Sequence, residues 1–287
     1  MSVPIARTVD ELKRTVAEWR SKGESIAVVP TMGALHAGHL SLVQAALDTA
    51  DRVIVTLFVN PKQFNSAADL AAYPRTEKED AAKLTPLGAH LLYCPDGEEM
   101  YPAGFATTVS VSGVSEGLCG AYRPGHFDGV ATVVAKLLMQ TDADFAFFGE
   151  KDFQQLQVVR RLVADLDIPV AIIGCPTVRE EDGLAMSSRN LRLSASERAI
   201  APILARQLFQ AADKIVAGEP IAQCLNRARS CILEQGFQSV EYLELCDEHK
   251  LIPLVKADQP TRILSAVWLG GIRLIDNVIV TKTEASK

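Results

Sequence analysis

Apolar residues in the first two thirds of the chain follow two alternating patterns. Short continuous apolar runs, which are typical of strands buried on both faces, are separated by longer segments with apolar residues every three or four positions, the spacing of an amphipathic helix. The predicted strands are 26–29, 53–59, 91–94, 145–148 and 170–175; the predicted helices are 8–20, 38–50, a short one after 76, one over 130–138, and 153–166. Strands and helices that alternate in this way form parallel sheets with right-handed crossovers, so an α/β fold is predicted.

Local patterns refine two of these predictions. Two of the helices begin with the Thr-x-x-Glu pattern of a capping box, Thr8 with Glu11 and Thr76 with Glu79. The segment 106–111 alternates polar and apolar residues, which favours an exposed strand.

The alternation stops at a polar, glycine-containing linker, 177–190. Beyond it, two helical stretches (196–217 and 221–235) precede three strand-like runs (240–246, 261–269 and 272–280), a pattern that favours a small α+β domain with an antiparallel sheet. We therefore expect a Rossmann-like parallel-sheet nucleotide-binding domain over 1–184 and a smaller α+β C-terminal domain over 185–287. Residues 186–189 at the junction suit a mobile loop that closes over a ligand between the two domains.

The turn after the predicted strand 26–29 carries the strongest indication of function. His36 and His39 stand three residues apart where a helix is predicted to begin, so their side chains can point the same way. Gly33 permits a tight turn and Gly38 a close approach of a ligand. Unpaired N–H groups and the positive end of the helix dipole make such a site suitable for a polyphosphate. The alternative is a helix cap and a surface residue; a Walker loop is excluded, because no Gly-Lys-Ser/Thr follows.

Two further loops hold polar side chains with open interpretations. Gln63 follows the second strand of this α/β unit, at the same sheet edge as the histidines, and is either a solvated loop residue or an amide that binds substrate. Arg123 and His126 precede another helix in a glycine-containing loop, where a simple turn is favoured over a site.

The strand 145–148 is also followed by a turn and a helix, and Lys151 lies in that turn. Both turns should lie at the carboxyl edge of the sheet, so Lys151 could reach phosphates held by the two histidines. The alternative is a surface lysine paired with Glu150 or Asp152. Gln155, four residues on, should face the same side as Lys151.

Composition limits the choice of partner. The chain has 287 residues with a net charge of −6, which offers no general attraction to nucleic acid or to an anionic membrane. Neither a signal peptide nor an apolar stretch long enough for a membrane helix is evident, so we expect a cytoplasmic protein with small-molecule substrates. The six cysteines show no Cys-x-x-Cys pair, which argues against zinc and a disulfide framework; we expect reduced thiols and assign no residue as a metal ligand.

Several segments taken together resemble a known family. They are Pro-Thr-Met-Gly-Ala-Leu-His-Ala-Gly-His at 30–39, Phe-Val-Asn-Pro-Lys-Gln-Phe at 58–64, Tyr-Pro-Arg at 73–75, Arg-Pro-Gly-His-Phe at 123–127, Phe-Gly-Glu-Lys-Asp-Phe-Gln-Gln-Leu at 148–156, Asp-Gly-Leu-Ala-Met-Ser-Ser-Arg-Asn at 182–190 and Arg-Leu-Ile-Asp-Asn at 273–277. His-Ala-Gly-His and Met-Ser-Ser-Arg are similar to the signature motifs of the nucleotidylyl-transferase superfamily. The whole set resembles the pantothenate synthetase family, the pantoate:β-alanine ligases.

The resemblance implies an ATP-dependent condensation of pantoate with β-alanine through a pantoyl-adenylate, with Mg²⁺, in a homodimer formed through the N-terminal domain. It implies charge stabilisation by His36, His39, Lys151, Ser187, Ser188 and Arg189, with His39 as proton donor. It implies an ATP surface made of Met32, Gly33, Ala34, Leu35, His36, Ala37, Gly38, His39, Gly149, Glu150, Lys151, Asp152, Val178, Met186, Ser187, Ser188 and Arg189. Gln63 and Gln155 are implied to hold pantoate, with Gln63 also near β-alanine, and no base for β-alanine is identified.

Other functions compete with this interpretation. A cytidylyl- or adenylyl-transferase for a phosphorylated substrate would need more cations near the acceptor, and an aminoacyl-tRNA synthetase would need a basic domain for RNA. A non-catalytic nucleotide sensor could use the same fold, because fold does not determine function. A sensor would bind ATP without releasing pyrophosphate.

Overall fold

The computed structural model describes residues 2–280 and divides into two compact units. The first unit contains residues 2–115, Arg123–Glu150 and Gln155–Pro176. The second contains Glu116–Tyr122, Lys151–Gln154 and the chain from Thr177 onward. The main change of unit thus falls at the start of the polar linker, and two short segments from earlier in the chain belong to the second unit.

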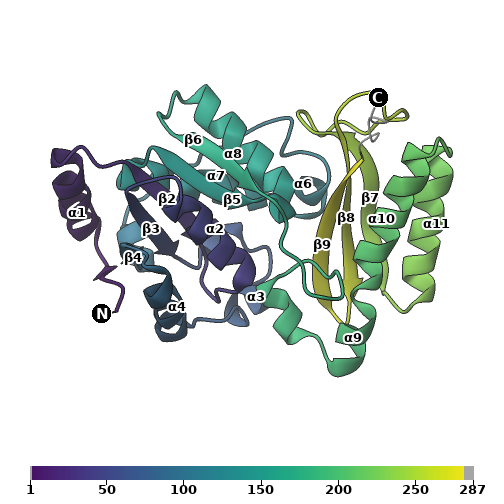
Figure 1. The fold of residues 1–287 in the computed structure, drawn as a ribbon, viewed down its shortest axis with the longest axis horizontal. Coiled ribbons are helices and arrows are strands. Elements are labelled where there is room, and N and C mark those ends of the chain that lie inside the picture. Colours follow the sequence, from purple (N-terminus) through teal and green to yellow (C-terminus); the bar gives the residue numbers. More distant parts are fainter. Residues whose placement is uncertain (1, 281–287) are drawn as a thin grey trace. The chain divides into compact units, whose positions relative to one another are not determined.

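The first unit is built on a six-stranded sheet in which every pairing is parallel (Figure 1). The strands are β1 (Ile5–Ala6), β2 (Ile26–Thr31), β3 (Arg52–Leu57), β4 (Leu91–Tyr93), β5 (Phe145–Gly149) and β6 (Ala171–Cys175), in the order β1-β4-β3-β2-β5-β6. β2 pairs with β3 on one side and with β5 on the other, so the strand order reverses there. Ligands of open α/β sheets bind at this kind of switch point, beyond the carboxyl ends of the strands.

Helices pack against this sheet. The helices of the first unit are α1 (Val9–Ser21), α2 (Ala37–Leu47), α3 (Ala67–Ala71), α4 (Glu77–Leu84), α5 (Gly97–Met100), α7 (His126–Thr141) and most of α8 (Phe153–Asp165), with short 3-10 turns η1 (Pro61–Gln63) and η2 (Thr85–Leu87); the turn η3 (Glu150–Asp152) stands where the chain passes to the second unit. Side chains of α2 and α4 pack on one face, against Ala27, Val29, Val53 and Val55 of β2 and β3. These residues alternate along each strand and so point to the same face. Because the residues between them are buried as well, the sheet is covered on both faces.

The predicted α/β fold is confirmed, with local corrections. The capping box of Thr8 and Glu11 is present at the start of α1. The one predicted at Thr76 is wrong, because the Thr76 hydroxyl donates to the Asp80 carboxylate instead of capping α4. The expected strand over 106–111 is also wrong, because the segment has no regular structure. The strand β1 was not predicted, because it is only two residues long. It pairs with β4 at the edge of the sheet.

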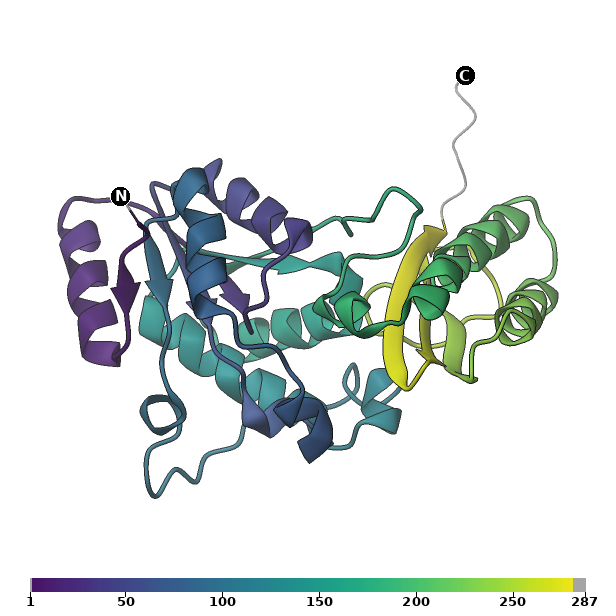
Figure 2. The same cartoon turned by 90° about the horizontal axis from the view of Figure 1, so that it is seen from below.

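The second unit has an antiparallel sheet covered by helices on one side. β7 (Ser239–Asp247), β8 (Thr261–Leu269) and β9 (Ile272–Val280) are paired in sequence order, and α10 (Ile203–Val216) and α11 (Ile221–Glu234) pack against them through a shared apolar core (Figure 2). α6 (Cys119–Tyr122), α9 (Ala195–Ile200) and the 3-10 turn η4 (Ser188–Arg192) complete the unit. The predicted α+β domain is confirmed.

Two local features of the second unit have clear causes. The single helix expected over 196–217 is two helices, α9 and α10, because Pro202 lacks an N–H and cannot continue a helix through its own position. The tight hairpin between β8 and β9 has positive φ at Gly270 and Gly271, as a two-residue type I′ turn requires.

Within residues 2–280, no helix is both long and apolar enough to cross a membrane.

Asp144 joins three elements of the first unit. Its Oδ2 accepts hydrogen bonds at 2.7 Å from the N–H of Ile26, where β2 begins, and at 2.7 Å from Arg20 of α1. Burial raises the pKa of the Asp144 carboxyl, but these two partners outweigh it and hold the pKa below its usual value.

We predict that Asp144→Asn lowers the free energy of unfolding at pH 7 by about 1 kcal/mol, a modest value because the pair is partly exposed. The folded pKa lies below the unfolded value of about 3.9, so the stabilisation is present above that pH and is lost as the pH falls through the folded pKa. Urea unfolding at a series of pH values should therefore show the difference from the parent chain shrinking below about pH 4. Asp167→Asn, at an exposed loop position, is the matched control and should change stability little; a difference for Asp144→Asn that persists in acid would contradict the prediction.

Candidate active site

The two histidines lie at the N-terminal end of α2, directly beyond the carboxyl end of β2. Their ring centroids are 4.1 Å apart with an interplanar angle of 39°. The Nδ1 of His39 accepts a hydrogen bond from the backbone N–H of His36 at 3.3 Å, so the neutral ring of His39 carries its proton on Nε2. The expectation that the two side chains point the same way is therefore confirmed.

Gln63 is a buried side chain in η1, just after β3, and it is 8% exposed. Its Oε1 accepts a hydrogen bond from Asn60 at 3.0 Å, and its Nε2 lies 2.9 Å from the sulfur of Met32. Thioether sulfur is a weak acceptor, so the Nε2–H group of Gln63 can turn to a stronger acceptor on a ligand. Asn60 is itself held at Oδ1 by the Tyr101 hydroxyl at 2.8 Å.

Arg123 and His126 act on the backbone of Gln63. The His126 Nδ1 donates to the Gln63 carbonyl at 2.7 Å, and Arg123 donates to the same oxygen at 3.2 Å. Arg123 also contacts the His126 Nε2 at 3.1 Å, which places the proton of the neutral ring on Nδ1. The sequence favoured a plain turn for these residues; in the structure they fix the position of the loop that carries Gln63.

Lys151 lies in the second unit together with residues of β9. Its side chain is 18% exposed and its Nζ lies 3.6 Å from the Asp152 carboxylate, so the pairing considered from the sequence is present, but the lysine is largely buried. The Lys151 carbonyl accepts a hydrogen bond from the Asn277 side chain at 2.9 Å. Asn277 therefore anchors the turn that carries Lys151.

The neighbouring Asp276 anchors the polar linker of the second unit. Arg179 forms a two-pronged ion pair with it, at 2.7 and 2.9 Å, and also donates to the Gly183 carbonyl at 3.0 Å. Asp276 is almost fully buried, and burial raises the pKa of its carboxyl although Arg179 opposes the rise. Sequence reasoning assigned no role to Arg179, Asp276 or Asn277; the segment Arg-Leu-Ile-Asp-Asn at 273–277 was the signal that could have found two of them.

The Met-Ser-Ser-Arg segment follows a short hairpin in this linker. The hairpin is closed by the Met186 N–H, which donates to the Val178 carbonyl at 3.0 Å. The Ser187 hydroxyl then accepts from the Arg189 N–H at 3.3 Å and begins η4, in which Ser188 is buried. The segment is thus hydrogen-bonded to its surroundings in this structure, and its expected movement over a ligand stays a prediction.

The remaining predicted residues lie near these groups in sequence. Gly149 ends β5, next to β2 in the sheet, and Glu150 follows it in the first unit. Gln155 is half-buried in the first turn of α8, also in the first unit. The first unit therefore contains Met32, which contacts Gln63, and the two histidines, and the second unit contains Lys151, Val178 and 186–189.

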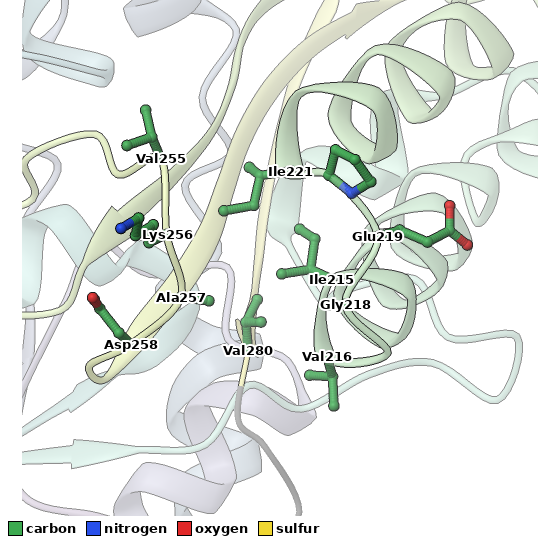
Figure 3. A pocket seen from close by; sticks show the side chains of 11 residues that line it. Ile215, Val216, Gly218, Glu219, Ile221, Val255, Lys256, Ala257, Asp258 and Val280 are labelled. Atoms are coloured by element: carbon green, nitrogen blue, oxygen red, sulfur yellow. The ribbon is translucent and has the colours of Figure 1, made fainter.

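A separate cavity of about 310 Å³ lies in the second unit (Figure 3). It is lined by Ile215, Val216, Gly218, Glu219, Pro220, Ile221, Val255, Lys256, Ala257, Asp258 and Val280. Figure 3 shows the side chains of Ile215, Ile221 and Val280 pointing toward one another. Its lining is mainly aliphatic and includes none of the predicted site residues, so we do not place the chemistry there. Among residues 2–280, no cluster of three or more His, Cys, Asp or Glu side chains could hold a metal ion.

Gly129 of α7 lies against the backbone of the Gln63 loop. A Cβ atom at Gly129 would stand 2.3 Å from the Lys62 carbonyl oxygen and 2.7 Å from the Gln63 nitrogen. We predict that Gly129→Ala lowers the free energy of unfolding by about 1 to 3 kcal/mol, the usual effect of overpacking. Thermal unfolding would measure it. Gly97→Ala, where an added Cβ meets nothing within 4 Å, is the control and should stay within about 0.5 kcal/mol; equal effects of the two variants would show that the close approach at Gly129 is unimportant.

Comparisons with known proteins identify the family of the chain. Residues 4–279 match the family described as pantoate-beta-alanine ligase. The pantothenate synthetase of Chelativorans sp. (strain BNC1) is 71% identical over 282 residues, covering 98% of this chain and 99% of that protein. A crystal structure of pantothenate synthetase from Thermus thermophilus is similar with a TM-score of 0.91 at 44% identity, covering 97% of this chain and 99% of the other. The Francisella tularensis pantoate-beta-alanine ligase, whose structure is described as complexed with beta-gamma ATP and beta-alanine, has a TM-score of 0.82 at 34% identity, with 97% and 98% coverage. The chain therefore belongs to the pantoate-beta-alanine ligase family.

Proposed function

We propose that this chain, as a pantoate-beta-alanine ligase, joins pantoate to β-alanine through a pantoyl-adenylate, releasing pyrophosphate and then AMP. The ligase activity is that of its family, and the adenylate route with its residue roles is our proposal. The observation that carries it is the His36–His39 pair at the N-terminal end of α2, beyond a strand that pairs with both β3 and β5. A helix N-terminus at a switch point of a parallel sheet is well suited to bind phosphates.

In the first step, the carboxylate of pantoate attacks the α-phosphorus of ATP. Carboxylic acids of this kind titrate near pH 4, so at neutral pH the nucleophile is already ionised and needs no strong general base. The step needs charge stabilisation on the phosphates and alignment of the attacking oxygen. We assign part of this charge stabilisation to His36 and His39, which stand beside the partial positive charge of the helix end.

The pyrophosphate leaving group requires further positive charge and hydroxyl donors. We assign this role to Lys151, Ser187, Ser188 and Arg189 of the second unit. Support comes from the way the turns that carry them are built: Asn277 holds the Lys151 carbonyl, and Ser187 begins the turn that carries Arg189.

Pantoate is a polyol with one carboxylate, and amides suit it better than additional cations. Gln63 and Gln155 are the proposed amides. Gln63 supports this role because its Nε2–H group is paired with the weak Met32 sulfur, while the rest of the residue is fixed by Asn60 and His126. The Gln63 amide is therefore preorganised with one donor that a substrate oxygen can recruit.

In the second step, the amine of β-alanine attacks the acyl carbon of the adenylate. A C–N bond forms, the acyl C–O bond breaks, AMP leaves with the bonding electron pair, and the amine loses a proton. Gln63 is the residue we place near β-alanine. No side chain is assigned as the base that takes the proton.

Mg²⁺ is part of the proposal as a companion of ATP. Mg²⁺ usually keeps several waters and binds through substrate phosphates with one or two carboxylates. We assign no side chain as its ligand. Bound to the phosphates, the ion would neutralise part of their charge.

The proposal also includes a cellular location and an oligomeric state. A cytoplasmic location is supported by the six cysteines, all of them free, which suits a reducing compartment. Burial raises the pKa of the Cys94 and Cys246 thiols to about 12, so both stay protonated. A homodimer through the N-terminal domain is carried over from the family resemblance, and sedimentation analysis would test it.

The route is tested by isotope exchange and by oxygen transfer. We predict that labelled pyrophosphate enters ATP only when pantoate is present, without β-alanine. Pantoate labelled with ¹⁸O in its carboxylate should deliver one labelled oxygen to AMP during turnover, because the amine breaks the acyl C–O bond of the adenylate. Label in orthophosphate, together with ADP, would rule out the adenylate; ATP binding without any exchange or product would favour a nucleotide sensor.

The assignment of Lys151 has its own test. We predict that Lys151→Ala lowers the rate of pyrophosphate exchange by roughly 10² to 10³, the effect of removing one donor to developing charge. Far-UV circular dichroism should stay unchanged. Lys214→Ala, at an exposed site on α10 in the same unit, is the matched control and should keep the parent rate. A parental rate for Lys151→Ala would leave Lys151 with only its pairing to Asp152.

A further inference from the structure

The loop that leads to the two histidines, residues 32–36, is hydrogen-bonded to the carboxylate of Asp80, which has no role in the proposed mechanism. Asp80 lies in the first turn of α4 and has no exposed surface. Its Oδ2 accepts the N–H of Ala34 and its Oδ1 accepts the N–H of Leu35, both at 2.8 Å. One side chain thus binds two consecutive backbone groups of the loop that leads into α2.

The bound part of the loop has a strained backbone. Gly33 and Ala34 both have positive φ, 83° and 51°. Glycine adopts this left-handed region freely, but a residue with a Cβ does so at an energetic cost. Ala34 is therefore held in a conformation that it would not favour alone, and its N–H group is one of the two that Asp80 binds. Such strain persists only where the surroundings impose it.

Two neighbouring side chains of this segment add further hydrogen bonds to Asp80 and to the loop. The Thr76 hydroxyl donates to the Asp80 Oδ2 at 3.1 Å, which orients the carboxylate from within α4. Lys83, one turn further along α4, donates to the Leu35 carbonyl at 2.6 Å, and its Nζ lies 3.9 Å from the Asp80 Oδ1. The loop is consequently held at two N–H groups and one carbonyl, immediately before His36.

The chemistry requires a carboxylate at this position. Two backbone donors need two acceptor oxygens, and an ionised aspartate provides both, whereas an asparagine would aim its NH₂ group at one of the donors. The Ala34 and Leu35 N–H groups are also committed to Asp80, so they do not serve as phosphate donors.

We propose that Asp80 is a positioning residue: it holds Ala34 in the left-handed conformation and so sets where His36, His39 and the start of α2 meet the phosphates of ATP. The inference rests on the proposed function of this loop. It predicts a specific rescue, because glycine at position 34 would need no carboxylate to adopt a positive φ.

The test compares the parent chain with Asp80→Asn, Ala34→Gly and the double variant. In Asp80→Asn, the dissociation constant for ATP, measured by calorimetry, should rise ~10- to 100-fold, because two hydrogen bonds to a charged group are disrupted. The affinity for pantoate should change less, since Gln63 is held mainly by Asn60, Arg123 and His126, which lie outside the loop. Adding Ala34→Gly should recover most of the lost ATP affinity.

The control is Asp167→Gly, which relieves a positive φ of 50° at an exposed position elsewhere in the first unit. It should leave ATP binding unchanged and should not rescue Asp80→Asn. Equal rescue by both glycines would mean that general stability was restored, and no rescue by Ala34→Gly would also overturn the proposal.

Two measurements keep the inference testable on its own. If Asp80→Asn does not fold, Thr76→Val removes only the hydroxyl that orients Asp80, and it should weaken ATP binding less but with the same rescue by Ala34→Gly. Pantoate-dependent pyrophosphate exchange by the parent chain tests the proposed function separately. Exchange in the parent chain combined with unaltered ATP binding in Asp80→Asn or Thr76→Val would reject the role of Asp80 alone.

Discussion

The parallel pairing of β2 with both β3 and β5 is the constraint on which the rest of the first unit depends. Because the three strands run the same way, the loops that follow them leave the sheet at one edge. The loop after β2 carries the histidines, the loop after β3 carries Gln63, and β5 ends at Gly149. A strand reversed at any of these positions would send its loop to the opposite edge, so the candidate site follows from strand direction before any side chain is considered.

A second principle is common to both units: buried or partly buried polar side chains hold the backbone of the loops that bear the candidate groups. His126 and Arg123 bind the Gln63 carbonyl, and Asn277 binds the Lys151 carbonyl. Asp80 does the same for the loop before His36. A side chain can be displaced by a ligand, whereas a backbone group bound from behind stays in place. The loops that bear the candidate side chains are therefore held in position through their backbone.

The two buried carboxylates next to these loops, Asp80 and Asp276, each have specific hydrogen-bond or ion-pair partners. Asp80 faces two N–H groups and the Thr76 hydroxyl, and Asp276 faces both nitrogens of the Arg179 fork. A buried carboxylate without such partners would be costly. These interactions consequently specify one loop geometry more than they add stability, because each is satisfied only when the loop adopts the observed conformation.

The sequence by itself determined the fold class and the order of most elements, because burial on both faces and helical spacing are local patterns that survive without tertiary context. It also indicated His36, His39 and Gln63, which stand in loops directly after predicted strands. Tertiary structure alone decided the roles of Asp80, Arg123, His126 and Asn277, whose partners lie tens of residues or more away in the chain. It also decided that Thr76 serves Asp80 and not a capping box. A local sequence pattern shows which side chains a segment contains. A hydrogen bond between distant segments forms only when the chain folds, so the spacing of residues within either segment cannot predict it.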